Sequence, residues 1–172
     1  MTQDLLLQNL RHLLPQVSFE AGQQFSWSPA TSTITYLSSR NRNNPNSNNL
    51  WALLHEASHA LLGHMNYQRD IELLLLEVDA WEKSKILAKQ FNIYIDEDHV
   101  QDCLDTYRDW LHQRATCPRC STVSLQASIS KYQCHNCQAT WTVTKARFCR
   151  SYRLSNPSNK KSPETISQAT FR

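Results

Sequence analysis

Glycine is scarce in this chain, which contains only two glycines among 172 residues. Phosphate-binding loops need several glycines in close succession, so the composition disfavours nucleotide hydrolysis. Long apolar runs are also lacking, because the longest, Leu50–Leu54, is much shorter than a membrane span. The first residues show no cationic leader and no small-residue cleavage site. We therefore expect a soluble, cytoplasmic protein with no membrane partner.

The cysteines are clustered. Four of the six form two C-x2-C pairs with thirteen residues between them: Cys117 with Cys120, and Cys134 with Cys137. Four thiolates can complete a closed tetrahedral shell around zinc, which leaves no position for water or substrate. Without a secretion signal this spacing favours metal over disulfides, and a redox role for one pair is the weaker alternative. The pattern predicts a structural Zn²⁺ site in a small zinc ribbon, whereas Cys103 and Cys149 have no assigned role.

Charge is distributed unevenly along the chain. Residues 1–115 contain nine Lys or Arg against fourteen Asp or Glu, whereas residues 116–172 contain nine against one. The carboxy-terminal part combines cationic and aromatic side chains, a mixture suited to phosphates and stacked bases. The candidates for contact with nucleic acid or another partner are Arg119, Lys131, Lys145, Arg147 and Arg150, with Tyr132, Trp141, Phe148 and Tyr152. The alternative is a basic, solvated surface that docks on the acidic part.

The residue pattern divides the chain into a helix-rich domain over residues 1–115, a β-rich ribbon over residues 116–152 and a disordered basic tail over residues 153–172. Apolar residues at three- and four-residue steps predict helices over residues 3–14 and 50–62. Helix start signals predict two more, over residues 70–90 and 96–114, the last with Asp96 as its cap and acidic residues in its first turn. Strands are expected over residues 24–28, 33–37, 123–129 and 140–148. Asn48 or Asn49 is expected to cap the second helix, and Gly63 to end it. The predicted fold class is α+β.

An HExxH sequence, formed by His55, Glu56 and His59, lies inside the second predicted helix. Residues four apart share one helix face, so both imidazoles can bind one metal ion. Glu56 can then act as a general base toward water without binding the metal itself. The arrangement predicts a catalytic Zn²⁺ for amide hydrolysis, with Glu56 as the catalytic residue. The alternative is a chance pattern on an ordinary amphipathic helix.

Catalytic zinc needs a third protein ligand beside an open fourth position. Glu77 is the favoured candidate, because its helical neighbours are mostly apolar or small and an unpaired buried carboxylate is unfavourable. Asp79 is the next candidate, as a ligand or as an outer partner of a ligand. His64 lies one residue short of the third histidine in HExxHxxGxxH and would point away from His55 on a continued helix. We expect His64 at the helix end or as an outer partner.

The segment LLHEASHALLGH, followed by Glu77-Val78-Asp79-Ala80-Trp81, resembles the ImmA/IrrE metallopeptidase family, in which HExGHALLGH precedes ExEAN on the next helix. The likeness covers about residues 20–95. Ser58 and Trp81 differ from the family's glycine and small polar residue. The resemblance implies a minimal gluzincin-like metallopeptidase core, here with a four-cysteine zinc ribbon, and a protein or peptide substrate such as a transcriptional regulator.

Two other functions are possible. A SprT-like protease, which acts on DNA-bound proteins, is similar in joining HExxH to a carboxy-terminal zinc ribbon, but it requires a downstream histidine in a His-Gly context that this chain lacks. A nucleic-acid or regulatory binding module with an inactive helical site is the non-enzymatic alternative. The residue that would stabilise an oxyanion is unassigned among His64, Tyr67, Tyr94 and His99.

Overall fold

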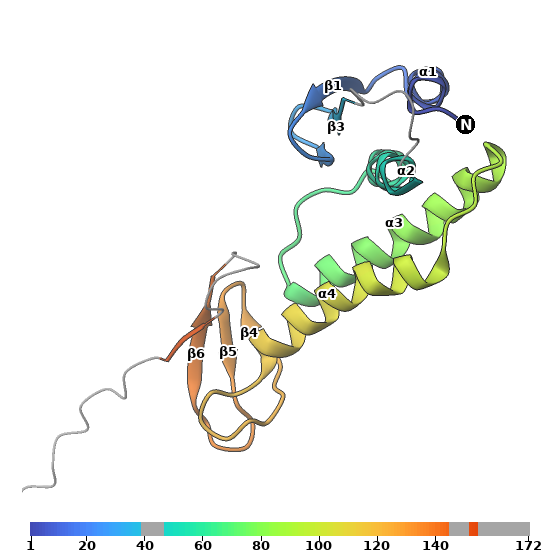
Figure 1. Cartoon of the computed structure of the whole chain (residues 1–172). Helices are drawn as coiled ribbons and strands as arrows, with labels where there is room; N and C mark the ends of the chain where they lie inside the picture. The colour runs from blue at the N-terminus through green and yellow to red at the C-terminus, as the bar shows by residue number, and fades with distance from the viewer. Residues whose placement is uncertain (39–46, 145–151, 155–172) are drawn as a thin grey trace, which may run out of the picture. The chain divides into compact units, whose positions relative to one another are not determined.

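The computed structural model describes residues 1–38 and 47–144, and the backbone of residues 152–154. Its contacts divide the chain into two compact units, Met1–Arg114 and Ala115–Arg172, called unit 1 and unit 2. The described residues form four helices and two small sheets, a mixed α+β structure (Figure 1). None of these helices is long and apolar enough to cross a membrane. The expectation of a disordered tail over residues 153–172 is wrong for Arg153 and Leu154, which lie in a strand, and residues 155–172 lie outside the described residues.

Unit 1 begins with helix α1 (Gln3–Leu13), which ends two residues before Pro15. The hydroxyl of Thr2 caps it by accepting a hydrogen bond from the backbone N–H of Leu5 at 3.3 Å. Helix α2 (Ser47–Leu61) begins three residues earlier than the sequence predicts. Asn48 and Asn49 therefore lie in its first turn, and the prediction that one of them caps a helix starting at Leu50 is wrong.

Two longer helices follow, α3 (Asp70–Gln90), which has the predicted bounds, and α4 (Glu97–Ala115), which begins directly after its predicted cap, Asp96. The carboxylate of Glu72 accepts hydrogen bonds from the backbone N–H groups of Gln68 and Arg69 at 2.8 and 3.1 Å. These bonds satisfy N–H groups that have no partner within the helix. Figure 1 shows α4 returning alongside α3 after a short turn.

Buried and exposed ion pairs connect α3 and α4 at opposite ends. Arg114 donates to both carboxylate oxygens of Asp70 at 2.7 and 3.1 Å, and both side chains are buried. At the other end Lys85 lies 3.1 Å from Glu97 in a more exposed pair. The two contacts fix α4 along α3, but only the first removes charge from water.

The sheet of unit 1 has the strand order β1-β3-β2 and contains β1 (Ser18–Gly22), β2 (Ser26–Ser28) and β3 (Thr33–Leu37). Strand β3 pairs in parallel with β1 and antiparallel with β2, which leaves β2 at one edge. Strand β1 is not predicted from the sequence: Phe19 and Ala21 alternate with polar residues, but the segment is short and its residues are exposed or half-buried. Strand β2 is shorter than the predicted segment over residues 24–28.

The core of unit 1 surrounds α2, which lies between the sheet and α3 (Figure 1). Leu53, Leu54 and Ala57 of α2 are completely buried and pack with residues of α1, β3, α3 and α4. Burial of this many apolar side chains stabilises the helix in place. The HExxH residues are therefore carried by the most enclosed helix of the unit.

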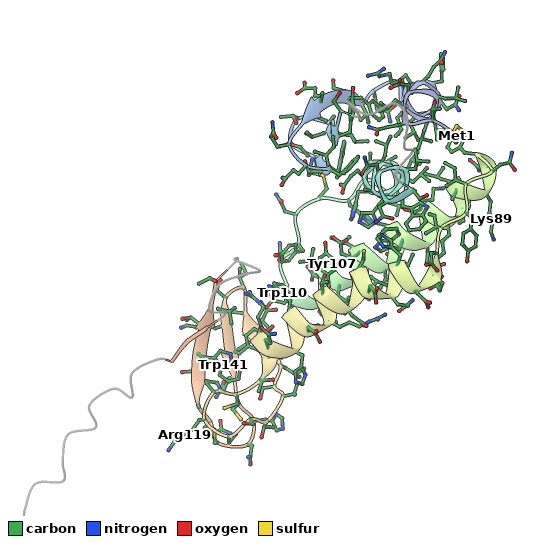
Figure 2. The ribbon with its side chains drawn as sticks, in the orientation of Figure 1. Met1, Lys89, Tyr107, Trp110, Arg119 and Trp141 are labelled. Atoms are coloured by element: carbon green, nitrogen blue, oxygen red, sulfur yellow. The ribbon has the colours of Figure 1, made fainter. Side chains whose placement is uncertain are left out.

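Unit 2 contains an antiparallel sheet of β4 (Gln126–Ser128), β5 (Lys131–Gln133), β6 (Thr140–Val143) and β7 (Tyr152–Leu154), in that order. The predicted strands over residues 123–129 and 140–148 correspond to the shorter β4 and β6, and β5 and β7 are not predicted. The rings of Tyr132 and Trp141 stack with centroids 5.5 Å apart, and both side chains are buried. Figure 2 labels Trp141 in unit 2. The expectation that these two rings are available to stack on bases is therefore wrong, because they form the core.

Candidate metal centres

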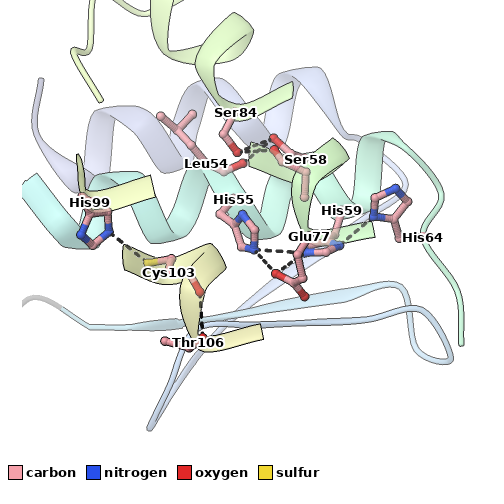
Figure 3. A network of polar contacts seen from close by, with 11 residues as sticks. Leu54, His55, Ser58, His59, His64, Glu77, Ser84, His99, Cys103 and Thr106 are labelled. Atoms are coloured by element: carbon pink, nitrogen blue, oxygen red, sulfur yellow. Dashed lines mark hydrogen bonds and ion pairs between the residues drawn. The ribbon is translucent and has the colours of Figure 1, made fainter. Parts of the chain in front are cut away.

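Three side chains converge in unit 1 where α2 faces α3 (Figure 3). His55 and His59 lie one turn apart on α2, and their Nε2 atoms are 3.1 Å from each other. Glu77 reaches them from α3, with Oε2 at 3.0 Å from Nε2 of His55 and 3.7 Å from Nε2 of His59. We call these three residues the His/Glu cluster. The structure thus brings the HExxH histidines together with Glu77, and Asp79 is not part of the cluster.

The separations of these ligand atoms fit a tetrahedral metal ion. Zinc bonds of about 2.0–2.1 Å at tetrahedral angles place neighbouring ligand atoms roughly 3.3 Å apart. The three distances in the cluster, 3.0, 3.1 and 3.7 Å, lie on both sides of that value. Hydrogen bonds between neutral imidazoles and one carboxylate cannot satisfy all three contacts at once, because each imidazole has a single proton. A cation bound by all three atoms satisfies them together.

Glu77 is the buried charge of this cluster, with 6% of its surface exposed. Burial alone raises its pKa, but hydrogen bonds from His55 and His59 outweigh burial and lower the pKa of Glu77 to about 2. The carboxylate is therefore ionised at neutral pH, as a metal ligand must be.

Glu56 points to the same region without joining the cluster. Burial raises the pKa of Glu56, while His55 and His59 oppose this shift. The backbone N–H of Trp27, on β2, donates a hydrogen bond to the Glu56 carboxylate and also lowers the pKa. A carboxylate with a raised pKa holds a proton more readily than an exposed one, which suits a general base.

A cavity of about 320 Å³ borders the His/Glu cluster and Glu56. Of the four residues considered as oxyanion stabilisers, His64 and Tyr67 line this cavity. Tyr94 lines a different cavity, and His99 packs between Trp51 and Trp81. Tyr107 of α4 also lines the cavity and is not singled out in the sequence, because only the return of α4 along α3 brings it there (Figure 2).

His64 lies next to the cluster, although it would point away on a continued helix. Helix α2 ends at Leu61, and Nδ1 of His64 is 2.8 Å from Nδ1 of His59 (Figure 3). Burial and the neighbouring His59 lower the pKa of His64, and the exposed Asp79 carboxylate acts in the opposite direction. Asp79 therefore influences the outer partner rather than the cluster itself.

The two residues that differ from the ImmA/IrrE pattern both lie against the site. The indole ring of Trp81 packs on the His55 ring with centroids 4.4 Å apart. The hydroxyl of Ser58 lies 3.0 Å from that of Ser84 on α3, and both side chains are completely buried. This hydroxyl contact links α2 to α3 seven residues after Glu77, on the same face of the helix. Ser58 and Trp81 thus both make contacts between the two helices that carry the cluster.

Unit 2 holds a second group of potential ligands, the four-cysteine cluster of Cys117, Cys120, Cys134 and Cys137. Sγ of Cys117 is 3.6 Å from that of Cys137, and Sγ of Cys120 is 3.5 Å from that of Cys134. Zinc–sulfur bonds of about 2.3 Å at tetrahedral angles separate neighbouring sulfur atoms by roughly 3.8 Å. The four residues are therefore positioned to bind a metal ion.

Hydrogen bonds lower the pKa of Cys120 and Cys134 and so favour the thiolate form, which is the form that binds metal. A backbone hydrogen bond lowers the pKa of Cys137, but burial and the neighbouring thiols outweigh it and raise the pKa of this thiol to about 11. The hydroxyl and backbone N–H of Thr122 lower the pKa of Cys120 to about 5. Backbone N–H groups of Arg119 and Cys137 donate to Sγ of Cys117 and Cys134 at 3.4 and 3.5 Å. Each C-x2-C pair thus forms a tight turn whose N–H groups point at sulfur.

The remaining predicted residues have less defined surroundings. Arg119 and Lys131 are exposed in unit 2, while Lys145, Arg147, Cys149 and Arg150 lie outside the described residues. Cys103 is half-buried against the core of unit 1, with Sγ 3.6 Å from Nε2 of His99, and burial raises the pKa of its thiol.

Comparisons with family models, with curated proteins and with solved structures find no match to this chain. The interpretation of both clusters therefore depends on their own geometry and chemistry.

Proposed function

We propose that this chain is a zinc-dependent metallopeptidase in which His55, His59 and Glu77 bind a catalytic zinc ion and Glu56 is the general base. The observation that carries the proposal is the convergence of three ligand atoms at tetrahedral separations beside a cavity that Glu56 also lines. Three protein ligands leave one position of a tetrahedral ion for water or substrate. The four-cysteine cluster is proposed to bind a structural zinc ion, because four thiolates leave no open position.

A zinc ion held by the His/Glu cluster would supply a Lewis acid that polarises a substrate carbonyl and makes water more acidic. Glu56 accepts the proton that the attacking water loses, and then passes it to the nitrogen of the leaving amine. The N–H of Trp27 holds the carboxylate of Glu56 toward the cavity during both transfers. The net reaction adds water across one peptide bond, with hydroxide on the carbonyl carbon and a proton on nitrogen.

The substrate class is proposed from the resemblance to the ImmA/IrrE family, which implies a gluzincin-like core and a protein substrate such as a transcriptional regulator. Glu77 supports this assignment over the SprT-like one, because a carboxylate from the next helix completes the cluster instead of a third histidine. The burial of Tyr132 and Trp141 removes two of the aromatic rings that would support nucleic-acid binding by unit 2.

The proposal is tested by Glu56→Gln, which keeps the shape of the side chain and removes the base. The matched control is Glu20→Gln, at an exposed glutamate of β1. Zinc-loaded wild type and both variants are incubated with a quenched-fluorescence peptide library, and bound zinc is measured by elemental analysis. We expect two zinc ions per chain in all three proteins, with cleavage by Glu56→Gln about 10²–10⁴-fold slower than wild type. Equal cleavage by Glu56→Gln and wild type contradicts the mechanism, and a single zinc ion in wild type favours the binding-module alternative.

A further inference from the structure

The turn after α2 brings His64 back to the His/Glu cluster. Gly63 has a φ of +64°, a left-handed conformation that glycine adopts without strain. After this turn the backbone N–H of His64 donates to the carbonyl oxygen of His59 at 3.0 Å. The carbonyl oxygen of His64 accepts a hydrogen bond from Nε1 of Trp27 at 3.1 Å. Both backbone polar groups of His64 are thus anchored, which fixes the place of its ring.

The ring of His64 contacts His59 on the side away from the potential ligand atoms. Nδ1 of His59 lies 2.8 Å from Nδ1 of His64, whereas its Nε2 faces His55 and Glu77 (Figure 3). The two rings meet at an interplanar angle of 69° with centroids 4.9 Å apart. His64 is therefore placed as a partner of a ligand and not as a fourth ligand.

A contact between two Nδ1 atoms requires one proton between them. If His64 donates that proton, neutral His59 carries its own proton on Nε2, where it blocks metal binding. If His59 donates it, Nε2 of His59 keeps a lone pair that can bind a metal ion. Only the second arrangement is compatible with a metal ion in the His/Glu cluster.

We propose that His64 is a positioning residue for His59: its Nδ1 accepts the Nδ1–H of His59 and so keeps Nε2 of His59 available to the metal ion. This inference rests on the proposed catalytic zinc site. Hydrogen-bond acceptors of this kind fix the tautomer and orientation of a metal-binding imidazole, and removing them typically lowers metal affinity 10–100-fold.

His55, the other imidazole of the cluster, is held in a different way, so the role of His64 is specific to His59. Nδ1 of His55 is buried without a hydrogen-bond partner in the part of the chain that the structure describes. The His55 ring is oriented by packing against Trp81 instead. One imidazole is thus held by packing and the other by a hydrogen bond, so removing the acceptor should affect His59 and leave His55 in place.

The test compares His64→Ala, which removes the acceptor, with His64→Asn, whose side-chain oxygen can take the position of Nδ1. The control is His12→Ala, at an exposed histidine in the last turn of α1. Co²⁺ binding to the full chain is followed by absorption, because thiolate-bound cobalt gives intense charge-transfer bands that an imidazole–carboxylate site lacks. The two clusters can therefore be titrated separately.

We expect His64→Ala to lower the Co²⁺ affinity of the His/Glu cluster by about 10–100-fold. The Asn variant should recover most of this loss, and His12→Ala should match wild type. In ¹⁵N-labelled, zinc-loaded wild type, imidazole NMR should place the proton of His59 on Nδ1 and that of His64 on Nε2. A merely structural role of His64 would not predict either the rescue by Asn or these tautomers.

Wild-type affinity in His64→Ala overturns the positioning role and leaves the proposed function intact. An equal loss in the Ala and Asn variants, or the opposite tautomers, overturns it as well. Wild-type protein that binds cobalt only at the four-cysteine cluster refutes the proposed catalytic site and this inference with it.

Discussion

The His/Glu cluster and the four-cysteine cluster reach similar geometry by different means. Ligands of the first are carried by two long helices, and α2 packs within the largest apolar core of the chain. Ligands of the second are carried by two tight turns beside a core of only a few buried residues. A large core can hold ligand atoms together before metal arrives, whereas a small one depends on the metal. This difference predicts opposite responses of the two units to metal loss.

The largest expected effect is the loss of unit 2 in Cys134→Ser. Cys134 is completely buried, and structural zinc contributes roughly 10–16 kcal/mol to the folding of small zinc domains. We expect the amide resonances of unit 2 to lose their dispersion while those of unit 1 keep theirs. Cys103→Ala, at the half-buried thiol of unit 1, is the control and should leave both sets in place. A folded unit 2 in Cys134→Ser, or in protein treated with a strong chelator, would show that the ribbon does not need its metal.

The next effect concerns the stability of unit 1 without metal. Asp70→Ala leaves Arg114 buried without its partner, which should lower the free energy of unfolding by about 3–5 kcal/mol. Glu97→Ala removes the exposed pair between the same two helices and should lower it by no more than about 1 kcal/mol. Urea unfolding in the presence of a chelator measures both. Similar losses in the two variants would mean that unit 1 is not held by its buried interior.

The last variant, Glu77→Gln, should affect folding less than Asp70→Ala does, and it should have the most specific effect on metal binding. Loss of the charged hydrogen bond with His55 should lower the free energy of unfolding by about 1–3 kcal/mol. The variant should nevertheless stay folded and lose the zinc ion of unit 1 alone, as measured by elemental analysis. Glu82→Gln, at an exposed glutamate of the same helix, should retain both ions. Unfolding of unit 1 in Glu77→Gln would remove the contrast between the two clusters.

Local patterns in the sequence account for much of this comparison. The bounds of α3 are predicted from helix start and stop signals, and a four-residue spacing is sufficient to put His55 and His59 on one helix face. Glu77 is indicated by its apolar neighbours, because an ionised group on such a stripe needs a cation. The paired C-x2-C sequences indicate the four-cysteine cluster for a similar reason, since two tight turns can share one ion.

Features that depend on backbone conformation or on contacts between distant residues cannot be predicted from local sequence patterns. The sequence indicates that the helix ends at Gly63 and that His64 is an outer partner, but the contact between His64 and Nδ1 of His59 depends on the left-handed φ of Gly63. Arg114 and Asp70 are 44 residues apart and meet only because α4 returns along α3. Strand β1 is short and its residues are exposed or half-buried, so its pairing with β3 is set by the tertiary structure. The stacking of Tyr132 on Trp141 likewise depends on the register of β5 and β6.

Trp27 connects the two functional elements of unit 1 through chemically different groups. Its main-chain N–H donates a hydrogen bond to the carboxylate of Glu56, while its indole N–H donates one to the carbonyl oxygen of His64. Any residue except proline supplies the amide, but no other side chain reproduces the indole. A change of residue at position 27 would therefore loosen the end of α2 and keep the main-chain hydrogen bond to Glu56, so that metal retention and the acidity of the base can change separately.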